Sequence, residues 1–138
     1  MPHDAREPTQ FVFSFEEKKL GLLTDLGSIT SHVLDAFTGC DALLVEANHD
    51  PSMLAAGPYP ASLKARVGGP WGHLSNAQAA SLLEQIDLSR LQHLVVGHIS
   101  RQNNSLACAQ ATLNPIVGEL RSVHYACQDE GFDWLVVN

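Results

Sequence analysis

The stretch Leu20-Gly-Leu-Leu-Thr-Asp-Leu-Gly27 reads as an apolar strand that runs into an aspartate and stops on a turn containing glycine. Two later stretches repeat the arrangement. Leu43-Leu-Val45 runs into Glu46, and Leu94-Val-Val-Gly97 runs into His98. Loops converge and ligands bind at the carboxyl ends of strands in an α/β layer. Two carboxylates and an imidazole delivered to such ends indicate a metal site.

The length and composition indicate one globular domain. The chain has 138 residues, of which 45% are hydrophobic and 17% are charged, so a packed core is expected. No apolar run approaches the roughly 20 residues that cross a bilayer, and the N-terminus lacks a signal-peptide pattern. A cytoplasmic protein without a membrane partner is therefore expected. Cys40, Cys108 and Cys127 show no C-x-x-C spacing, which argues against a disulfide framework and a thiolate zinc site.

The charge balance bears on the kind of substrate. The formal net charge is −7, the isoelectric point is about 5.3, and no basic patch for coating nucleic acid is evident. If the substrate is a phosphodiester, the charge of a local metal ion has to replace the missing lysines. Seven histidines are numerous for this length and favour metal chemistry.

Alternation and turn residues predict an α/β fold with a mixed sheet and flanking helices. Phe11–Phe15 is expected as a half-buried strand in an antiparallel hairpin with Leu20–Thr24. Further strands are expected at residues 42–46, 92–97, 122–127 and 132–137. Helices are expected at residues 30–37, 51–57, 60–67 and 75–86, and after the caps at 103–105, where Pro115 kinks or shortens the helix.

Each candidate for chemistry has a structural alternative. Asp25 either ends its strand in an Asx turn or bridges two divalent ions, since one carboxylate can offer an oxygen to each. His98 is either a strand-end histidine with a local partner or a ligand suited to zinc or manganese. His73 precedes a predicted helix N-terminus, which attracts phosphate oxygens, and it either donates a proton to a leaving alkoxide or packs under Trp71.

Several other polar residues lie beside these candidates. Asp50 is explained as a helix cap, which leaves Glu46, Asn48 and His49 for substrate contacts or for orienting the ligands.

The order of five motifs resembles that of metallo-β-lactamase-fold hydrolases, and most of all the YycJ-like exonucleases and related phosphodiesterases. The motifs are Pro2-His-Asp-Ala-Arg-Glu-Pro8, Thr24-Asp-Leu-Gly27, Glu46-Ala-Asn-His-Asp50, Gly72-His-Leu-Ser-Asn76, and Gly97-His-Ile-Ser100 with Asn103-Asn104. The resemblance covers essentially the whole chain. It implies an αββα sandwich in which two divalent ions, zinc or manganese, activate the attack on phosphorus or on a carbonyl.

The resemblance also implies roles for individual residues. His3 would bind one metal ion, Asp25 would bridge the pair, and His98 would bind the second ion. His73 would be a general acid in the loop that holds the substrate phosphate. Substrate contacts are expected from Ser75, Asn76, Glu46, Asn48 and His49.

The sequence departs from the family in one respect. The signature H-x-H-x-D-H is absent, so each ion would have only two protein ligands, whereas catalytic zinc usually has three. Residues 1–138 are therefore interpreted as a single partial domain, the C-terminal half of the fold. Weak or partial metal binding and little activity are expected. The open sheet is expected to associate with the missing N-terminal half or with another copy.

Three functions remain open on the sequence. The main hypothesis is a metal-dependent phosphodiesterase or exonuclease acting on nucleic acid, incomplete in this chain. The alternative is a non-catalytic partner or degenerate fragment that retains only the fold. A third is a thioester or lactam hydrolase on the same scaffold.

Overall fold

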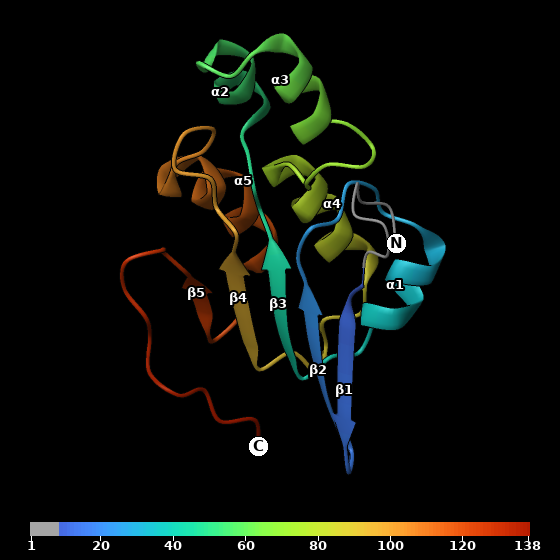
Figure 1. Ribbon diagram of the computed structural model, residues 1–138. Coiled ribbons are helices and arrows are strands. Elements are labelled where there is room, and N and C mark those ends of the chain that lie inside the picture. Colours follow the sequence, from blue (N-terminus) through green and yellow to red (C-terminus); the bar gives the residue numbers. More distant parts are fainter. Residues whose placement is uncertain (1–8) are drawn as a thin grey trace.

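A hairpin begins the part of the chain that the computed structural model describes, residues 9–138 (Figure 1). Strand β1 (Phe11–Phe15) pairs antiparallel with β2 (Lys18–Leu23), with Phe11 opposite Leu22. Glu16 takes a positive φ of 52° in the turn between them. The predicted hairpin is confirmed.

The remaining strands extend the sheet in parallel. They are β3 (Ala42–Glu46), β4 (His93–Gly97) and β5 (Val123–Tyr125), and the strand order is β1-β2-β3-β4-β5. One antiparallel pair and three parallel pairs make the sheet mixed, as predicted. The parallel strands β2, β3 and β4 end at the same edge of the sheet, where the candidate residues follow them.

Five helices lie within residues 9–138, and their caps follow the sequence. They are α1 (Ser31–Phe37), α2 (Pro51–Ala56), α3 (Ala61–Val67), α4 (Asn76–Gln85) and α5 (Leu106–Val117). Thr30, Asp50, Ser75 and Ser105 cap α1, α2, α4 and α5 with side-chain hydrogen bonds, and Ser75 closes a capping box with Gln78. Pro115 lies inside α5, which continues to Val117. None of the helices in the described part of the chain is long and apolar enough to span a membrane.

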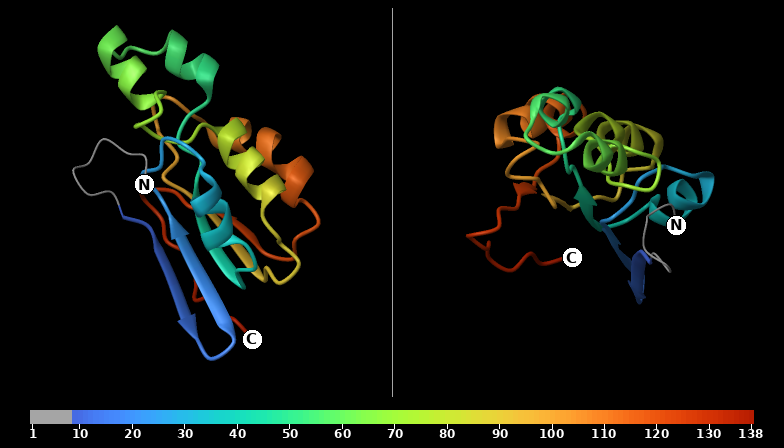
Figure 2. Two further views of the ribbon diagram at one scale, coloured as in Figure 1. Left: turned by 90° about the vertical axis from the view of Figure 1, so that its right-hand side faces the viewer. Right: turned by 45° about the horizontal axis from the view of Figure 1, so that its top comes forward.

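The helices divide between one face of the sheet and its end. Helices α1, α4 and α5 cover one face, whereas α2 and α3 stand beyond the carboxyl ends of the strands (Figures 1 and 2). The core forms between the sheet and the covering helices. Its fully buried members include Leu23, Leu43, Val45, Leu94 and Val96 from the sheet, and Val33, Phe37, Leu82, Leu83 and Leu113 from the helices.

The opposite face of the sheet is open at the hairpin. Phe11, Phe13 and Phe15 are 51%, 52% and 78% exposed, so the expectation of a half-buried strand was wrong. The register places Phe13 opposite Leu20, and alternate side chains of a strand share a face. The three phenylalanines and Leu20 therefore form one apolar surface on the face away from the helices. We call it the open sheet face.

The C-terminal segment differs from the prediction. The predicted strand at 122–127 shortens to Val123–Tyr125, and the strand expected at 132–137 is absent from the described sheet. The segment meets the sheet at scattered points, because His93 Nε2 contacts the Val136 carbonyl and Gln92 bonds the Asn138 backbone. Such contacts through side chains give no continuous backbone ladder.

Candidate metal centre

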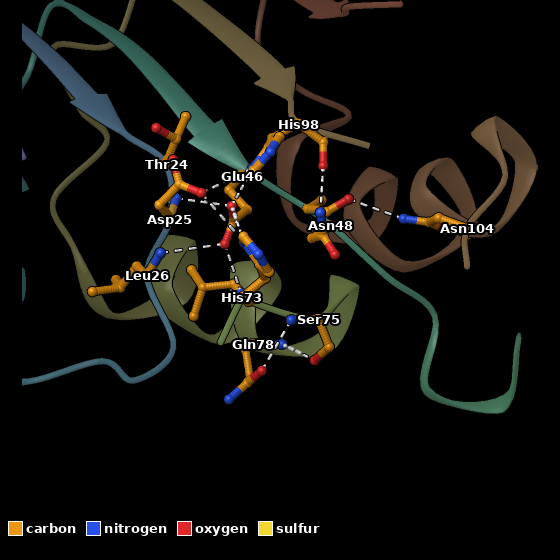
Figure 3. A network of polar contacts seen from close by, with 12 residues as sticks. Thr24, Asp25, Leu26, Glu46, Asn48, His73, Ser75, Gln78, His98 and Asn104 are labelled. Carbon is orange, nitrogen blue, oxygen red and sulfur yellow. Dashed lines mark hydrogen bonds and ion pairs between the residues drawn. The ribbon is translucent and has the colours of Figure 1, made fainter. Parts of the chain in front are cut away.

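Four side chains converge at the carboxyl ends of the parallel strands (Figure 3). They are Asp25, Glu46, His73 and His98, and each offers a carboxylate oxygen or ring nitrogen that lies within 4.8 Å of the others. Asp25 follows β2, Glu46 ends β3 and His98 follows β4, while His73 comes from the loop before α4. The structure thus brings together the three strand-end groups that the sequence singled out and His73, the predicted general acid.

Glu46 is the centre of the cluster. Its side chain is 0% exposed. One carboxylate oxygen accepts a hydrogen bond from the backbone N–H of Leu74 at 2.7 Å, and the other accepts one from the N–H of Asp25 at 2.9 Å. The N–H of Leu26 donates a longer bond of 3.4 Å. A buried carboxylate is therefore held by the two loops that carry Asp25 and His73.

The two imidazoles complete the surroundings of this carboxylate. His98 Nδ1 lies 2.5 Å from Glu46 Oε2, and His73 Nδ1 lies 3.2 Å from the same oxygen. The two rings meet edge to face, with centroids 5.1 Å apart. Because each Nδ1 atom is directed at Glu46, Nε2 is the ring nitrogen that either histidine would use toward an ion or a substrate.

Burial and hydrogen bonding act in opposite directions on Glu46. Burial alone would raise its pKa. The hydrogen bonds from His73, His98 and the N–H groups of Leu74 and Asp25 outweigh burial and hold the pKa of Glu46 at about 2. The hydrogen bond to Glu46 is also the main reason why the pKa of His98 is raised above its ordinary 6.5. Glu46 is therefore ionised at neutral pH and stabilises positive charge on His98.

The backbone places Asp25 and His98 in the left-handed region. Their φ angles are 56° and 54°, values that residues other than glycine rarely adopt. In this conformation the Asp25 carboxylate lies 3.6 Å from His73 Nδ1 and 3.8 Å from His98 Nδ1. Strained backbone at two members of one cluster is typical of functional sites.

Close backbone packing positions His73. A Cβ atom on Gly72 would lie 2.2 Å from the carbonyl oxygens of Arg66 and Val67, and one on Gly27 would lie 2.5 Å from the Gly72 nitrogen. The N–H of His73 donates to the Val67 carbonyl at 2.9 Å. Only glycine fits at these two positions, so the turn after Asp25 and the loop before His73 pack directly against each other.

The donor set fits a divalent ion. Two carboxylates and two imidazoles are ligands that zinc and manganese accept. The Glu46 carboxylate already accepts hydrogen bonds from both histidines. The atoms left to bind an ion are therefore the carboxylate oxygens of Asp25 and the Nε2 atoms of His73 and His98. His3, the other predicted ligand, lies outside the described residues.

The predicted substrate-binding residues other than Glu46 lie around this cluster. Asn48 Nδ2 donates to the His98 carbonyl at 2.9 Å. Asn76 is buried and exchanges two hydrogen bonds with Asn104. Ser75 caps α4. His49 is buried, which lowers its pKa, and its Nδ1 atom has no hydrogen-bond partner among the described residues. These contacts fix the loops that carry His73 and His98, and a role in binding substrate stays a prediction.

The central place of Glu46 is what the sequence reasoning missed. The sequence predicts for Glu46 a contact with substrate or a role in orienting the ligands. One feature of the sequence could have indicated this central position. Glu46 is the only acidic residue that forms the last position of a predicted strand, after four apolar residues. The backbone N–H groups that bond it come from loops whose path no spacing shows.

Comparison with known proteins supports the family resemblance. The chain is 32% identical over 117 residues to exodeoxyribonuclease YycJ of Bacillus anthracis, which covers 85% of this chain and 44% of that protein. It is 34% identical over 111 residues to exodeoxyribonuclease WalJ of Streptococcus pneumoniae, which covers 80% of this chain and 41% of that protein. No protein-family model matches the chain.

Among solved structures, the chain is similar to a diphosphatase of the PhnP family. The TM-score is 0.44 and the identity is 18%, over 78% of this chain and 32% of that one.

The sequence matches confirm that this chain is related to the YycJ-like exonucleases, as its motifs indicated. The chain spans less than half the length of the curated relatives that it matches.

Proposed function

We propose, from this kinship with the YycJ and WalJ exodeoxyribonucleases, that the chain supplies part of the active site of a metal-dependent phosphodiesterase acting on nucleic acid. The observation that carries the proposal is the convergence of Asp25, Glu46, His73 and His98 within one small cluster. Carboxylates and imidazoles at the carboxyl ends of parallel strands are typical of hydrolytic metal sites.

Asp25 and His98 are the residues proposed to hold metal. The two histidines are oriented by Glu46, a buried carboxylate bonded to Nδ1 of both rings. A carboxylate behind a metal-binding histidine fixes the ring and raises its basicity. A bound zinc or manganese ion would supply Lewis acidity toward a phosphate oxygen. The complete enzyme is proposed to use two such ions, with His3 among the ligands of one.

His73 is proposed to donate a proton to the leaving alkoxide. Its Nδ1 atom contacts Glu46 at 3.2 Å, so its Nε2 atom would carry the transferred proton. His73 also lies just before the N-terminus of α4, where the helix dipole favours negative charge nearby.

The site is proposed to be incomplete in this chain. The relatives contain more than twice the aligned length, and the open sheet face leaves the three phenylalanines of β1 largely exposed. Both observations support further polypeptide that covers this face and contributes the missing ligands. Metal binding by the chain alone is then weak, and turnover is slight or absent.

Metal binding and activity test the two parts of the proposal separately. Isothermal titration with Mn²⁺ or Zn²⁺ is compared between the wild-type chain, D25N and H98A, with the exposed residues of D35N and H32A as matched controls. Binding lost in the first pair and kept in the second supports the metal site. Equal binding in all variants favours the non-catalytic alternative. Robust, chelator-sensitive cleavage of bis(p-nitrophenyl) phosphate by the wild-type chain would contradict incompleteness.

A further inference from the structure

A cavity of about 320 Å³ lies beside the metal-centre cluster. His98 forms part of its lining, together with Asn48, Tyr59 and Arg101. Tyr59 belongs to the connection between α2 and α3, the two helices that stand beyond the carboxyl ends of the strands (Figure 1). The volume is at the lower end of the range of about 300–1,000 Å³ that is usual for small-molecule sites. A molecule bound there would contact the same edge of the sheet as the proposed metal.

Hydrogen bonds between two loops hold the walls of this cavity in place. Besides the bond from Asn48 to the His98 carbonyl, the N–H of Ser100 donates to the Asn48 carbonyl at 2.9 Å. The N–H of Asp50 donates to the Asn103 carbonyl at 2.8 Å. The loops after β3 and β4 are thereby tied together, so the cavity is formed before anything binds.

The side chains of the cavity suit a nucleotide. Tyr59 supplies an aromatic ring, on which a nucleobase can stack. Arg101 is the only arginine or lysine among the described residues that line the cavity, and guanidinium groups pair well with phosphate. Gln102 and Gln128 add carboxamides. The chain has a net charge of −7, so this cation is not part of a generally basic surface.

The present partner of Arg101 is easily replaced. Its guanidinium forms an ion pair of 2.5 Å with Asp129, and the two side chains are 57% and 75% exposed. Ion pairs between exposed side chains contribute little stability. A phosphate can therefore take the place of the Asp129 carboxylate at small cost, and Asp129 acts as a competitor for it.

We infer that this cavity binds one nucleotide of a single DNA strand, with the base on Tyr59 and the phosphate on Arg101. The inference rests on the proposed function, because it takes the substrate to be a nucleic acid. A second cavity of about 300 Å³ shares Arg101 with the first and is also lined by Leu106 and Tyr125. The strand has room to continue there.

The base contact is tested by fluorescence anisotropy in EDTA, with a labelled oligothymidylate and a matched oligomer of abasic sites. Y59A should weaken binding of the oligothymidylate about fivefold or more, because stacking on an aromatic ring contributes strongly for each base. Y59F keeps the ring and should bind like the wild type. The abasic oligomer should not distinguish the three proteins.

The phosphate contact is tested in the same assay at several salt concentrations. R101Q should weaken binding of both oligomers and reduce the slope of log affinity against log salt by about 0.7, the value for one contact with a single strand. D129N should strengthen binding, because it removes the competitor. R121Q is the matched control, since Arg121 is exposed and lines a different cavity at the other end of β4.

Three results would overturn the inference: no binding of either oligomer, equal binding by Y59A and wild type, or equal losses in R101Q and R121Q. Circular dichroism of each variant identifies a loss that is caused by unfolding. The assay contains no metal, so failure of this inference leaves the titration with Mn²⁺ or Zn²⁺ unaffected. Conversely, loss of the metal site would leave Tyr59- and Arg101-dependent binding in EDTA intact.

Discussion

The imidazole of His98 contacts the carboxylate of Glu46, with Nδ1 and Oε2 2.5 Å apart, although 52 positions separate the residues in sequence. The parallel register explains the contact, because Glu46 pairs with Gly97 and His98 follows directly. Two adjacent strands thus end in an acid and a base that face each other.

Replacing Glu46 should damage the fold as well as the site. E46Q puts an NH₂ group or a weaker acceptor against donors that now bond a carboxylate. Loss of buried, charge-assisted hydrogen bonds should lower the free energy of unfolding by about 1.5–3 kcal/mol. Urea unfolding in EDTA measures this, with E84Q on the exposed side of α4 as control. An equal effect of the two changes would contradict the central role of Glu46.

The contact should also make metal-free stability depend on pH. The folded pKa of Glu46, about 2, is below its ordinary 4.5, so its contribution is present above pH 4.5 and is lost as pH falls toward 2. The folded pKa of His98 is raised, so its contribution is complete below pH 6.5 and is lost as pH rises through the folded value. The stabilisation from the pair should be greatest between these limits.

Urea unfolding across the pH range, in EDTA, measures this profile for wild type and H98A. The difference between the two curves isolates His98 from buried His49, whose lowered pKa acts in the opposite direction in both proteins. The difference should shrink above pH 6.5. H32A, with an exposed histidine, should leave the profile unchanged. A difference that does not vary with pH would contradict the assigned contact.

The left-handed backbone at position 25 predicts an unusual ranking of variants. D25G and D25A both remove the carboxylate, but only glycine adopts a φ of 56° without strain. D25G should be more stable than D25A by about 1 kcal/mol, whereas glycine is ordinarily neutral or unfavourable. Chemical denaturation in EDTA compares them. Both variants should lose metal binding equally, so stability and binding are separated within one pair.

Close packing behind His73 predicts a large effect of one methyl group. In G72A the new Cβ atom would overlap the carbonyl oxygens of Arg66 and Val67, so the loop has to move. The free energy of unfolding should fall by about 1–3 kcal/mol, as in other overpacked sites. G131A is the control, because a Cβ atom there meets nothing within 4 Å. Similar thermal stability of the two variants would contradict the packing.

The open sheet face predicts self-association of the isolated chain. Phe13 is 52% exposed on this face, and exposed apolar patches are aggregation-prone. F13S should shift the concentration-dependent molecular mass toward the monomer in sedimentation experiments. W71S removes an exposed aromatic from the loop before α4 and should have no such effect. Monomeric wild-type protein at every concentration would contradict the prediction.

Local chemistry made much of the fold predictable. Each cap lies where a Ser, Thr or Asp precedes an apolar helix, and the parallel strands coincide with apolar runs. The apolar alternation of Phe11–Phe15 predicted the strand correctly but not its exposure. Alternation shows that one face is apolar, and whether anything covers that face depends on the rest of the assembly. The prediction of a strand at residues 132–137 was wrong for a related reason. A run of apolar residues does not by itself supply a neighbouring strand for the backbone to pair with.

The candidate site was predictable in its members and not in its arrangement. Asp25 and His98 stood out because each follows an apolar strand. The role of Glu46 depends on backbone N–H groups of Leu74 and Asp25, which every residue carries and which leave no mark in the sequence. The left-handed conformation of His98 was not predicted either, because histidine is enriched at positive φ but adopts it in only a small fraction of cases.

The carboxylate of Glu46 has five donors around it that all belong to the chain itself: three backbone N–H groups and two imidazoles. The chain's own groups therefore satisfy this buried carboxylate without help from the proposed ion. An ion held at the rim by Asp25 and His98, as proposed, could be exchanged while the interior stays closed. Which ion occupies the proposed site would then depend on the cations present around the folded protein, and not on those present while it folded.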